Sequence, residues 1–140
     1  MMPKVTLHHI ALMVADLDAA IAFYWDALGI ALEGAHDVEA EGVRVAFLPL
    51  HGDYANRPPA IELVQPTRQD TGVAKWMAKH GQGMHHICVQ VDDIDAAMKR
   101  ASEHGATFTS AEPGRKSDGT RYVFIHPKTA FGALIELVQT

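Results

Sequence analysis

The first half of this 140-residue chain alternates between two hydrophobic patterns. Some stretches are short and apolar, and others are longer, with apolar residues at helical spacing. The stretch "HIALMV" at 9–14 predicts a strand. Asp16 then precedes "LDAAIAFYWDAL", where apolar residues recur at helical intervals until Gly29, so this segment is expected to be a capped helix. The stretches "VRVAFLPL" and "AIELVQP" predict two further strands on either side of a loop at 52–59, and a weaker strand is expected near 30–37.

The second half shows the same order of patterns. "HICVQV" predicts a strand, Asp93 a helix cap, and "IDAAMKRASEHG" a helix that ends at Gly105. "ATFTS", "YVFIHP" and "ALIELVQ" predict three strands, and the turn-rich segment 112–119 predicts a mobile, ligand-facing loop. Between the halves, Asp70 is expected to cap a helix, "TGVAKWMAKH", that Gly81 ends.

These elements predict one α+β domain, 1–140, built from two βαβββ modules. Module one covers about 5–67, a linking helix about 70–81, and module two about 83–140. The sequence itself repeats: "LHHIALMVADLDAA" at 7–20 aligns with "MHHICVQVDDIDAA" at 84–97, with eight of fourteen positions identical. The pentapeptide "IELVQ" at 61–65 also returns at 135–139. An internal repeat of this kind indicates two copies of one structural unit.

The repeated histidines and glutamates are predicted to share one face of the sheet, because side chains alternate along a strand. In the first strand Ile10, Leu12 and Val14 form a uniformly aliphatic face, which should be covered by helices. His9 lies on the opposite face, and His8 falls in register with the aliphatic one. By the same alternation, His86, Glu62 and Glu136 also take the face opposite their large aliphatic neighbours.

Two imidazoles and two carboxylates on one face suit a divalent metal ion. A carboxylate buried alone in such a strand costs several kcal/mol, so it needs a cation or a partner charge. The mixed nitrogen and oxygen set suits Zn, Co, Mn, Ni or Fe, and the sequence does not select among them. Two alternatives stay open: residues kept only by descent from an undiverged repeat, and two Glu–His ion pairs without metal. For Cys88 a small apolar role is expected rather than ligation.

Composition narrows the function classes. A net charge of −5 argues against a nucleic-acid partner, which would need a basic face. The single cysteine excludes an intrachain disulfide and favours a reducing compartment. The N-terminal stretch lacks the apolar region of a signal peptide, and no apolar run approaches the length of a membrane span. A soluble, cytoplasmic protein without a membrane partner is expected.

Several of these stretches resemble a known family. "HHIALMVADLDAAIAFYWDALG", "EGVRVAFLPL", "GQGMHHICVQVDDI", "FIHPK" and "LIELV" are similar, in order, to the vicinal oxygen chelate (glyoxalase/bleomycin resistance/dioxygenase) superfamily, and within it most of all to the methylmalonyl-CoA epimerases. The resemblance runs from about residue 7 to the end. It implies an open, cup-like eight-stranded sheet around a divalent metal, a homodimer, and an acyl-CoA substrate.

The resemblance also implies metal ligands at His9, Glu62, His86 and Glu136, the same four that strand alternation selects. One departure concerns the base that removes a proton. The family's glutamate two residues before the "GV" of the third strand is here Ala40, flanked by Glu39 and Glu41. The loop "HGDYANRPPA" is longer than the short connection usual in the family. The segment "DTGVAKW" lacks the Ser-Pro that commonly begins the linking helix in the family.

The implied reaction inverts the α-carbon of an acyl-CoA thioester through a metal-stabilised enolate. We expect Glu41, or Glu39, to serve as base on one face, and Glu136, or a group near it, to serve on the other. Lys128 and Arg115, or Lys116 in place of Arg115, are expected to meet CoA phosphates.

Three other activities are compatible with the same pattern. A glyoxalase I-type lactoylglutathione lyase would use the same four ligands. A metal-free binding protein of the bleomycin-resistance type would need none of them. An extradiol dioxygenase fits less well, because it uses three protein ligands and a longer chain.

Overall fold

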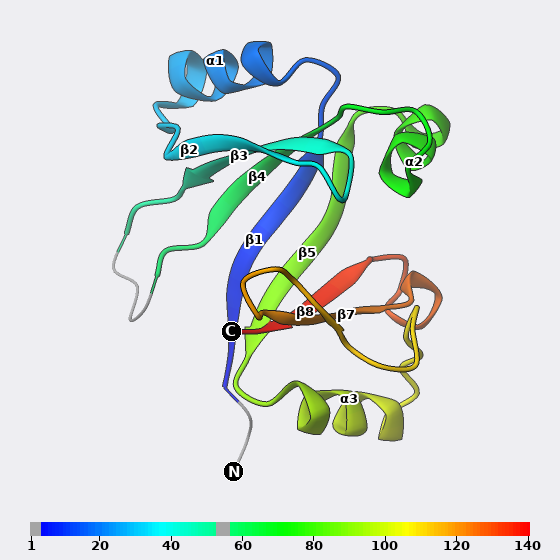
Figure 1. Cartoon of the computed structure of the whole chain (residues 1–140). Coiled ribbons are helices and arrows are strands. Elements are labelled where there is room, and N and C mark those ends of the chain that lie inside the picture. Colours follow the sequence, from blue (N-terminus) through cyan, green and yellow to red (C-terminus); the bar gives the residue numbers. More distant parts are fainter. Residues whose placement is uncertain (1–3, 53–56) are drawn as a thin grey trace. The chain divides into compact units, whose positions relative to one another are not determined.

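The computed structural model describes residues 4–52 and 57–140, arranged as three α-helices, eight strands and one 3₁₀ turn (Figure 1). Half of the loop expected at 52–59, residues 53–56, lies outside the described residues. The chain forms two compact units, one of residues 10–85 and the other of residues 1–9 together with 86–140. The boundaries of the units therefore differ from those of the sequence modules, because each unit includes part of β1 and part of β5.

The unit of residues 10–85 contains three antiparallel strands and two helices. Strand β2 (Gly34–Val38) pairs with β3 (Val43–Pro49), and β3 pairs with β4 (Ala60–Pro66) in a register that sets Phe47 opposite Glu62. The unit also holds helix α1 (Leu17–Leu28), helix α2 (Gly72–His80), the second part of β1 (Val5–Met13) and the first residues of β5, 83–85.

The other unit is built on β5 (Gly83–Val91), which pairs in parallel with β8 (Ile135–Gln139). Strand β7 (Arg121–Ile125) lies antiparallel to β8, and the two-residue strand β6 (Gly114–Arg115) pairs with β7. Helix α3 (Ile94–Glu103) and a 3₁₀ turn (Pro127–Thr129) belong to this unit.

The strands follow the order β2-β3-β4-β1-β5-β8-β7-β6 in one mixed sheet. An α+β fold with eight strands and repeated βαβββ order is therefore confirmed.

The cap of α1 lies where the sequence predicts it. The Asp16 side chain accepts a hydrogen bond from the Ala19 amide at 3.1 Å, and Gly29 ends the helix in the left-handed region with φ 70°. Asp93 caps α3 in the same way, through the Ala96 amide at 3.1 Å. Matching caps at equivalent places in both halves support the reading of the chain as a duplicated module.

Both faces of the sheet in the unit of residues 10–85 are covered. Leu12 and Val14 pack with Leu17 of α1, so the aliphatic face of β1 meets the helix that follows it. The opposite face is apolar as well, because Ala11 and Met13 are buried in a cluster that also holds Val73, Trp76 and Met77 of α2.

Three details of the prediction are wrong. The cap of α2 is Thr71, whose hydroxyl accepts from the Ala74 amide at 3.2 Å, while Asp70 instead pairs with Arg68 at 3.1 Å. The segment "ATFTS" forms only one isolated bridge, between Phe108 and Ile125, and the strand lies at β6 instead. Strand β2 begins four residues later than expected, at Gly34.

Candidate functional site

Three of the four predicted ligands converge in the unit that holds β5 and β8. His9 Nε2 lies 3.2 Å from His86 Nε2, and Glu136 Oε1 lies 3.2 Å from His86 Nε2 and 3.7 Å from His9 Nε2. One atom from each side chain thus lies within 4.8 Å of both others. The cluster is buried, with His9 4 % exposed and Glu136 3 % exposed.

Strand pairing explains why His86 and Glu136 meet. Cys88 lies opposite Glu136 in the parallel ladder of β5 and β8. His86 is two residues before Cys88 and therefore shares its face of the sheet, which is also the face that Glu136 takes. The Phe124 ring meets the His86 ring edge-on at 5.5 Å and packs beside it.

A lysine completes the cluster from an unexpected place. Lys116 Nζ lies 3.4 Å from Glu136 Oε2, so the carboxylate turns one oxygen to the imidazoles and the other to the ammonium group. Lys116 stands just after β6, where its amide donates to the Thr120 carbonyl at 2.7 Å. Its ammonium also lies 5.5 Å from the centre of the Tyr122 ring.

The surroundings keep His9 neutral and Glu136 ionised. Burial, reinforced by His86, lowers the pKa of His9 from 6.5 to about 3. Burial would raise the pKa of Glu136, but a hydrogen bond from His86 and the charge of Lys116 outweigh it and lower that pKa to about 2. A neutral imidazole and an ionised carboxylate are the forms that bind metal ions. A carboxylate with so low a pKa is a poor proton acceptor, so Glu136 fits the ligand role better than that of a base.

These shifts predict a loss of stability in acid for the metal-free protein. The unfolded chain protonates His9 near pH 6.5 and the folded chain only near pH 3, so the free energy of unfolding falls steadily as the pH is lowered across this window. Glu136 adds a second loss as pH falls from 4.5 to about 2. Urea unfolding from pH 7.5 to 4 with a chelator present measures this dependence. The free energy of unfolding of His9→Gln should depend less steeply on pH than that of the parent protein. Equal slopes for both proteins would contradict the assignment of this dependence to His9.

A glycine permits the approach of β6 to Tyr122. A Cβ built on Gly114 would lie 2.7 Å from Tyr122 Cζ, closer than real contacts allow. We expect Gly114→Ala to cost about 1–3 kcal/mol of unfolding free energy, because the ring or the strand must shift. Gly34→Ala is the control, since a Cβ there meets no atom within 4 Å. Urea unfolding of both variants is the measurement, and equal effects would contradict the argument.

The donor set suits a metal ion in its spacing as well as its chemistry. Two ligands about 2.05 Å from a tetrahedral ion stand about 3.3 Å apart. The distances in the cluster are 3.2, 3.2 and 3.7 Å, so little movement would let all three donors reach one ion. The buried, ionised carboxylate supplies the negative charge that a cation would need.

The remaining predicted residues lie outside this cluster or in the other unit. Glu62 is half-buried on β4 in the unit of residues 10–85, so the fourth ligand stays a prediction. Glu41 is exposed in the turn between β2 and β3, as are Ala40 and Glu39. Arg115 is exposed and donates to the Gly119 carbonyl at 3.1 Å, and Lys128 is exposed in the 3₁₀ turn.

Sequence reasoning gave too little weight to two residues beside the cluster. Lys116 was expected only as a substitute for Arg115 in phosphate binding, because periodicity does not report the reach of a side chain from a turn. His8 was expected on the other face of β1, yet its Nδ1 lies 2.8 Å from Nδ1 of His9. Cys88 is fully buried, as a small apolar residue would be, and its sulfur also lies within 4.8 Å of nitrogens of both histidines.

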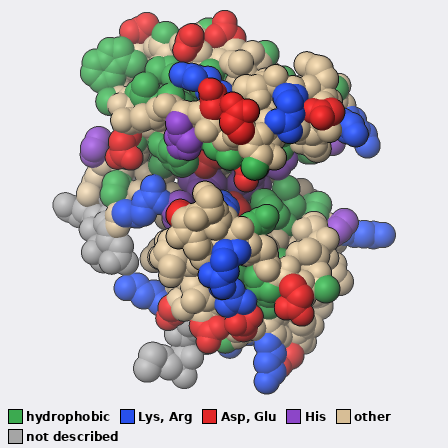
Figure 2. Space-filling model, in the orientation of Figure 1, with side chains coloured by type: hydrophobic (Ala, Val, Ile, Leu, Met, Phe, Trp, Pro, Cys, Tyr) green, Lys and Arg blue, Asp and Glu red, His purple; other side chains and the backbone are tan. Residues whose placement is uncertain are grey.

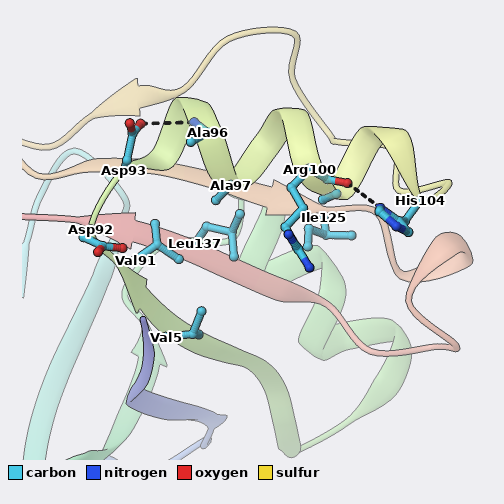
Figure 3. Close-up of a pocket in the computed structure, with 11 residues that line it drawn as sticks. Val5, Val91, Asp92, Asp93, Ala96, Ala97, Arg100, His104, Ile125 and Leu137 are labelled. Atoms are coloured by element: carbon cyan, nitrogen blue, oxygen red, sulfur yellow. Dashed lines mark hydrogen bonds between the residues drawn. The ribbon is translucent and has the colours of Figure 1, made fainter. Parts of the chain in front are cut away.

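A cavity of about 650 Å³ lies on the opposite face of the same unit. Figure 3 shows Val91 and Leu137 on the strands and Ala97 and Arg100 on α3, facing one another across it. Leu137 follows Glu136 directly, so it points to the other side of the sheet. The cavity is therefore separated from the cluster by the sheet itself.

The visible surface in Figure 2 carries lysine, arginine and acidic side chains interspersed, without a continuous basic area. Among residues 4–52 and 57–140, the structure contains no helix that is long and apolar enough to cross a membrane.

Comparisons with known proteins identify a superfamily and several named relatives. The profile of the Glyoxalase/Bleomycin resistance protein/Dioxygenase superfamily matches residues 8–124. The ethylmalonyl-CoA/methylmalonyl-CoA epimerase of Cereibacter sphaeroides is 38 % identical over 95 % of this chain and 96 % of its own length. The mitochondrial methylmalonyl-CoA epimerase of Homo sapiens is 35 % identical over 95 % of this chain and 73 % of its own.

Solved structures agree with the sequence comparison. Streptomyces coelicolor methylmalonyl-CoA epimerase, solved with 2-nitronate-propionyl-CoA, superposes with a TM-score of 0.85 at 36 % identity, over 98 % of this chain and 96 % of that one. A methylmalonyl-CoA epimerase solved with methylmalonyl-CoA and NH₄⁺ gives a TM-score of 0.83 at 36 % identity, over 96 % of this chain and 93 % of that one.

One relative by sequence has a different name. A probable lactoylglutathione lyase of Vibrio cholerae is 33 % identical over 94 % of this chain and 88 % of its own length.

Proposed function

Because the chain belongs to the Glyoxalase/Bleomycin resistance protein/Dioxygenase superfamily, we propose that it is an isomerase that inverts the α-carbon of methylmalonyl-CoA or a similar acyl-CoA thioester. The observation that carries this proposal is the convergence of two imidazoles and one buried carboxylate in a chain whose near-full-length relatives include such epimerases.

The reaction requires a weakly acidic hydrogen to leave the α-carbon and another to return on the opposite side. Loss of this hydrogen leaves negative charge on the thioester carbonyl as an enolate forms. A divalent cation in the cluster would supply electrostatic stabilisation of that charge. The choice among Zn, Co, Mn, Ni and Fe remains open, because nitrogen and oxygen donors suit all of them.

The protein would hold the ion through four side chains. His9, His86 and Glu136 form the part described above, and Glu62 is the predicted fourth ligand. Lys116, at 3.4 Å from Glu136, holds the outer oxygen of that carboxylate and leaves the other oxygen directed at the imidazoles. The ligands can thus bind without first losing a proton from Glu136.

Glu41 is our candidate for the base that removes the α-hydrogen, with Glu39 as the alternative in the same turn. The second proton-transfer group was expected to be Glu136, and its low pKa makes that role less favourable than ligation. Arg115 and Lys128 are the predicted contacts of the CoA phosphates, and both side chains are exposed.

Exchange with deuterated water tests the proposed reaction directly. Methylmalonyl-CoA of one configuration is incubated with purified protein in D₂O, and the product is followed by mass spectrometry and chiral analysis. We expect one deuterium at the α-carbon together with inversion. Lack of exchange in protein that carries one equivalent of metal would reject an epimerase of this substrate.

A lactoylglutathione lyase is the second candidate, and the Vibrio cholerae relative favours it. The glutathione hemithioacetal of methylglyoxal is tested with the same preparation. Formation of lactoylglutathione without exchange into methylmalonyl-CoA would select the lyase. Metal content is measured in protein prepared without an affinity tag. A content below about one tenth of an equivalent, with no activity gained on metal addition, would instead favour a metal-free binding protein. The cytoplasmic location and the homodimer stay predictions.

A further inference from the structure

We propose that His8 is a positioning residue, which accepts a hydrogen bond from Nδ1 of His9 and so directs the lone pair on Nε2 of His9 toward His86 and Glu136. The inference rests on the proposed metal site for its purpose. The contact itself is a property of the chain without any ion, because the two Nδ1 atoms lie 2.8 Å apart.

The distances around His9 decide which of its nitrogens carries the proton. His86 Nε2–H donates to Glu136 Oε1 at 3.2 Å, and His9 Nε2 stands 3.2 Å from the same His86 nitrogen. At that distance only one of the two Nε2 atoms carries a hydrogen, and it is the one on His86. His9 Nε2 also lies 3.7 Å from the carboxylate oxygen, which is longer than an N–H···O hydrogen bond.

A neutral imidazole has one N–H and one lone pair, so a lone pair on Nε2 puts the hydrogen of His9 on Nδ1. His8 then receives it through its own Nδ1, and the T-shaped arrangement of the rings, with centroids 5.1 Å apart, fits this contact. A ligand histidine commonly donates its second N–H to a fixed acceptor, which sets its tautomer and the orientation of its ring.

The neighbouring cysteine raises another possibility, a second metal ion held by His8, His9 and Cys88, whose donor atoms lie within 4.8 Å of one another. Spacing argues against it. Two nitrogens on one tetrahedral ion stand about 3.3 Å apart, whereas these two stand at the 2.8 Å of a hydrogen bond. Nδ1 of His9 thus serves as a donor to His8, and Nε2 remains for the ion.

Two variants separate the hydrogen bond from ring packing. His8→Phe keeps an aromatic ring and removes the acceptor, and His8→Asn removes the ring and keeps an acceptor oxygen. His104→Phe is the matched control, because His104 belongs to the same unit and its Nδ1 contacts the Arg100 carbonyl at 2.9 Å beside the cavity on the other face.

The first measurement is the tautomer of His9 in ¹⁵N-labelled, metal-free protein, by long-range ¹H–¹⁵N correlation near pH 8. We expect Nδ1–H in the parent protein, in His8→Asn and in His104→Phe, and a mixture of tautomers in His8→Phe. The result is independent of any substrate, so a wrong assignment of the reaction would leave it unchanged. A His9 hydrogen on Nε2 in the parent protein would overturn the proposal.

The second measurement is Co²⁺ affinity by competition with a chelator. We expect His8→Phe to raise the Kd by about 10–100-fold and His8→Asn to stay near the parent value. Equal losses in both His8 variants would mean that ring packing, and not the hydrogen bond, matters. Binding of two equivalents of Co²⁺ with a thiolate charge-transfer band would establish the His8–His9–Cys88 site and overturn the proposal.

Discussion

Replacing Glu136 with glutamine is expected to abolish stoichiometric metal binding and to lower epimerase activity by at least about 1,000-fold, which corresponds to about 4 kcal/mol of transition-state stabilisation. Glutamine keeps the shape of the side chain and removes its charge. Lys116 and the incoming cation would then face each other across a neutral amide in a site where the carboxylate was 3 % exposed. Elemental analysis and the deuterium-exchange assay measure the two effects.

Glu103→Gln removes a carboxylate from the exposed end of α3 and serves as the control. Its metal content and activity should match those of the parent. Glu62→Gln extends the test to the predicted fourth ligand, where we expect metal affinity to fall by more than the 10–100-fold that loss of a supporting hydrogen bond causes. A Glu136→Gln protein with a full equivalent of metal would refute the assignment of this carboxylate.

The second large effect is expected at the turn between β2 and β3. Glu41→Gln should lower kcat by about 10²–10⁴-fold with metal content unchanged, because a general base contributes a factor of that size. Glu39→Gln tests the alternative base, since both side chains are exposed in one turn. Exchange is followed from each epimer separately. Loss of one base should stop α-hydrogen removal from one epimer and spare it in the other.

A loss of activity confined to Glu39→Gln would identify Glu39 as the base and leave the proposed mechanism unchanged. Full activity in both variants would exclude this turn as the source of the base. The departure at Ala40 would then mark a chain that uses a different proton-transfer group.

Local patterns predicted the elements whose signals are local. Helix α1 and strand β4 have the expected bounds, because Asp16 and Gly29 define the helix, and the apolar residues on either side of Glu62 define the strand. Strand β6 escaped prediction because Gly114 and Arg115 pair through backbone groups and carry no apolar pattern. The cap of α2 was misplaced since Asp70 and Thr71 are adjacent candidates, and Arg68 binds the first.

The residues of the candidate site also divide into those that the sequence pattern predicted and those that it did not. Strand alternation together with the repeat selected His9, His86 and Glu136, which the structure brings together. Alternation reports the face of a side chain and not how far it reaches. It therefore could not anticipate that Lys116 extends from a turn to Glu136, or that His8 turns back toward its neighbour.

The composition of the unit that holds the cluster bears on how such a site could have arisen. His9 comes from the first module and His86 from the second, yet both belong to the unit of residues 1–9 and 86–140. An ancestral chain with a single module would have carried one such histidine. It could have brought two such histidines together only by associating with another molecule of itself, so gene duplication would have converted a two-chain cluster into a one-chain cluster.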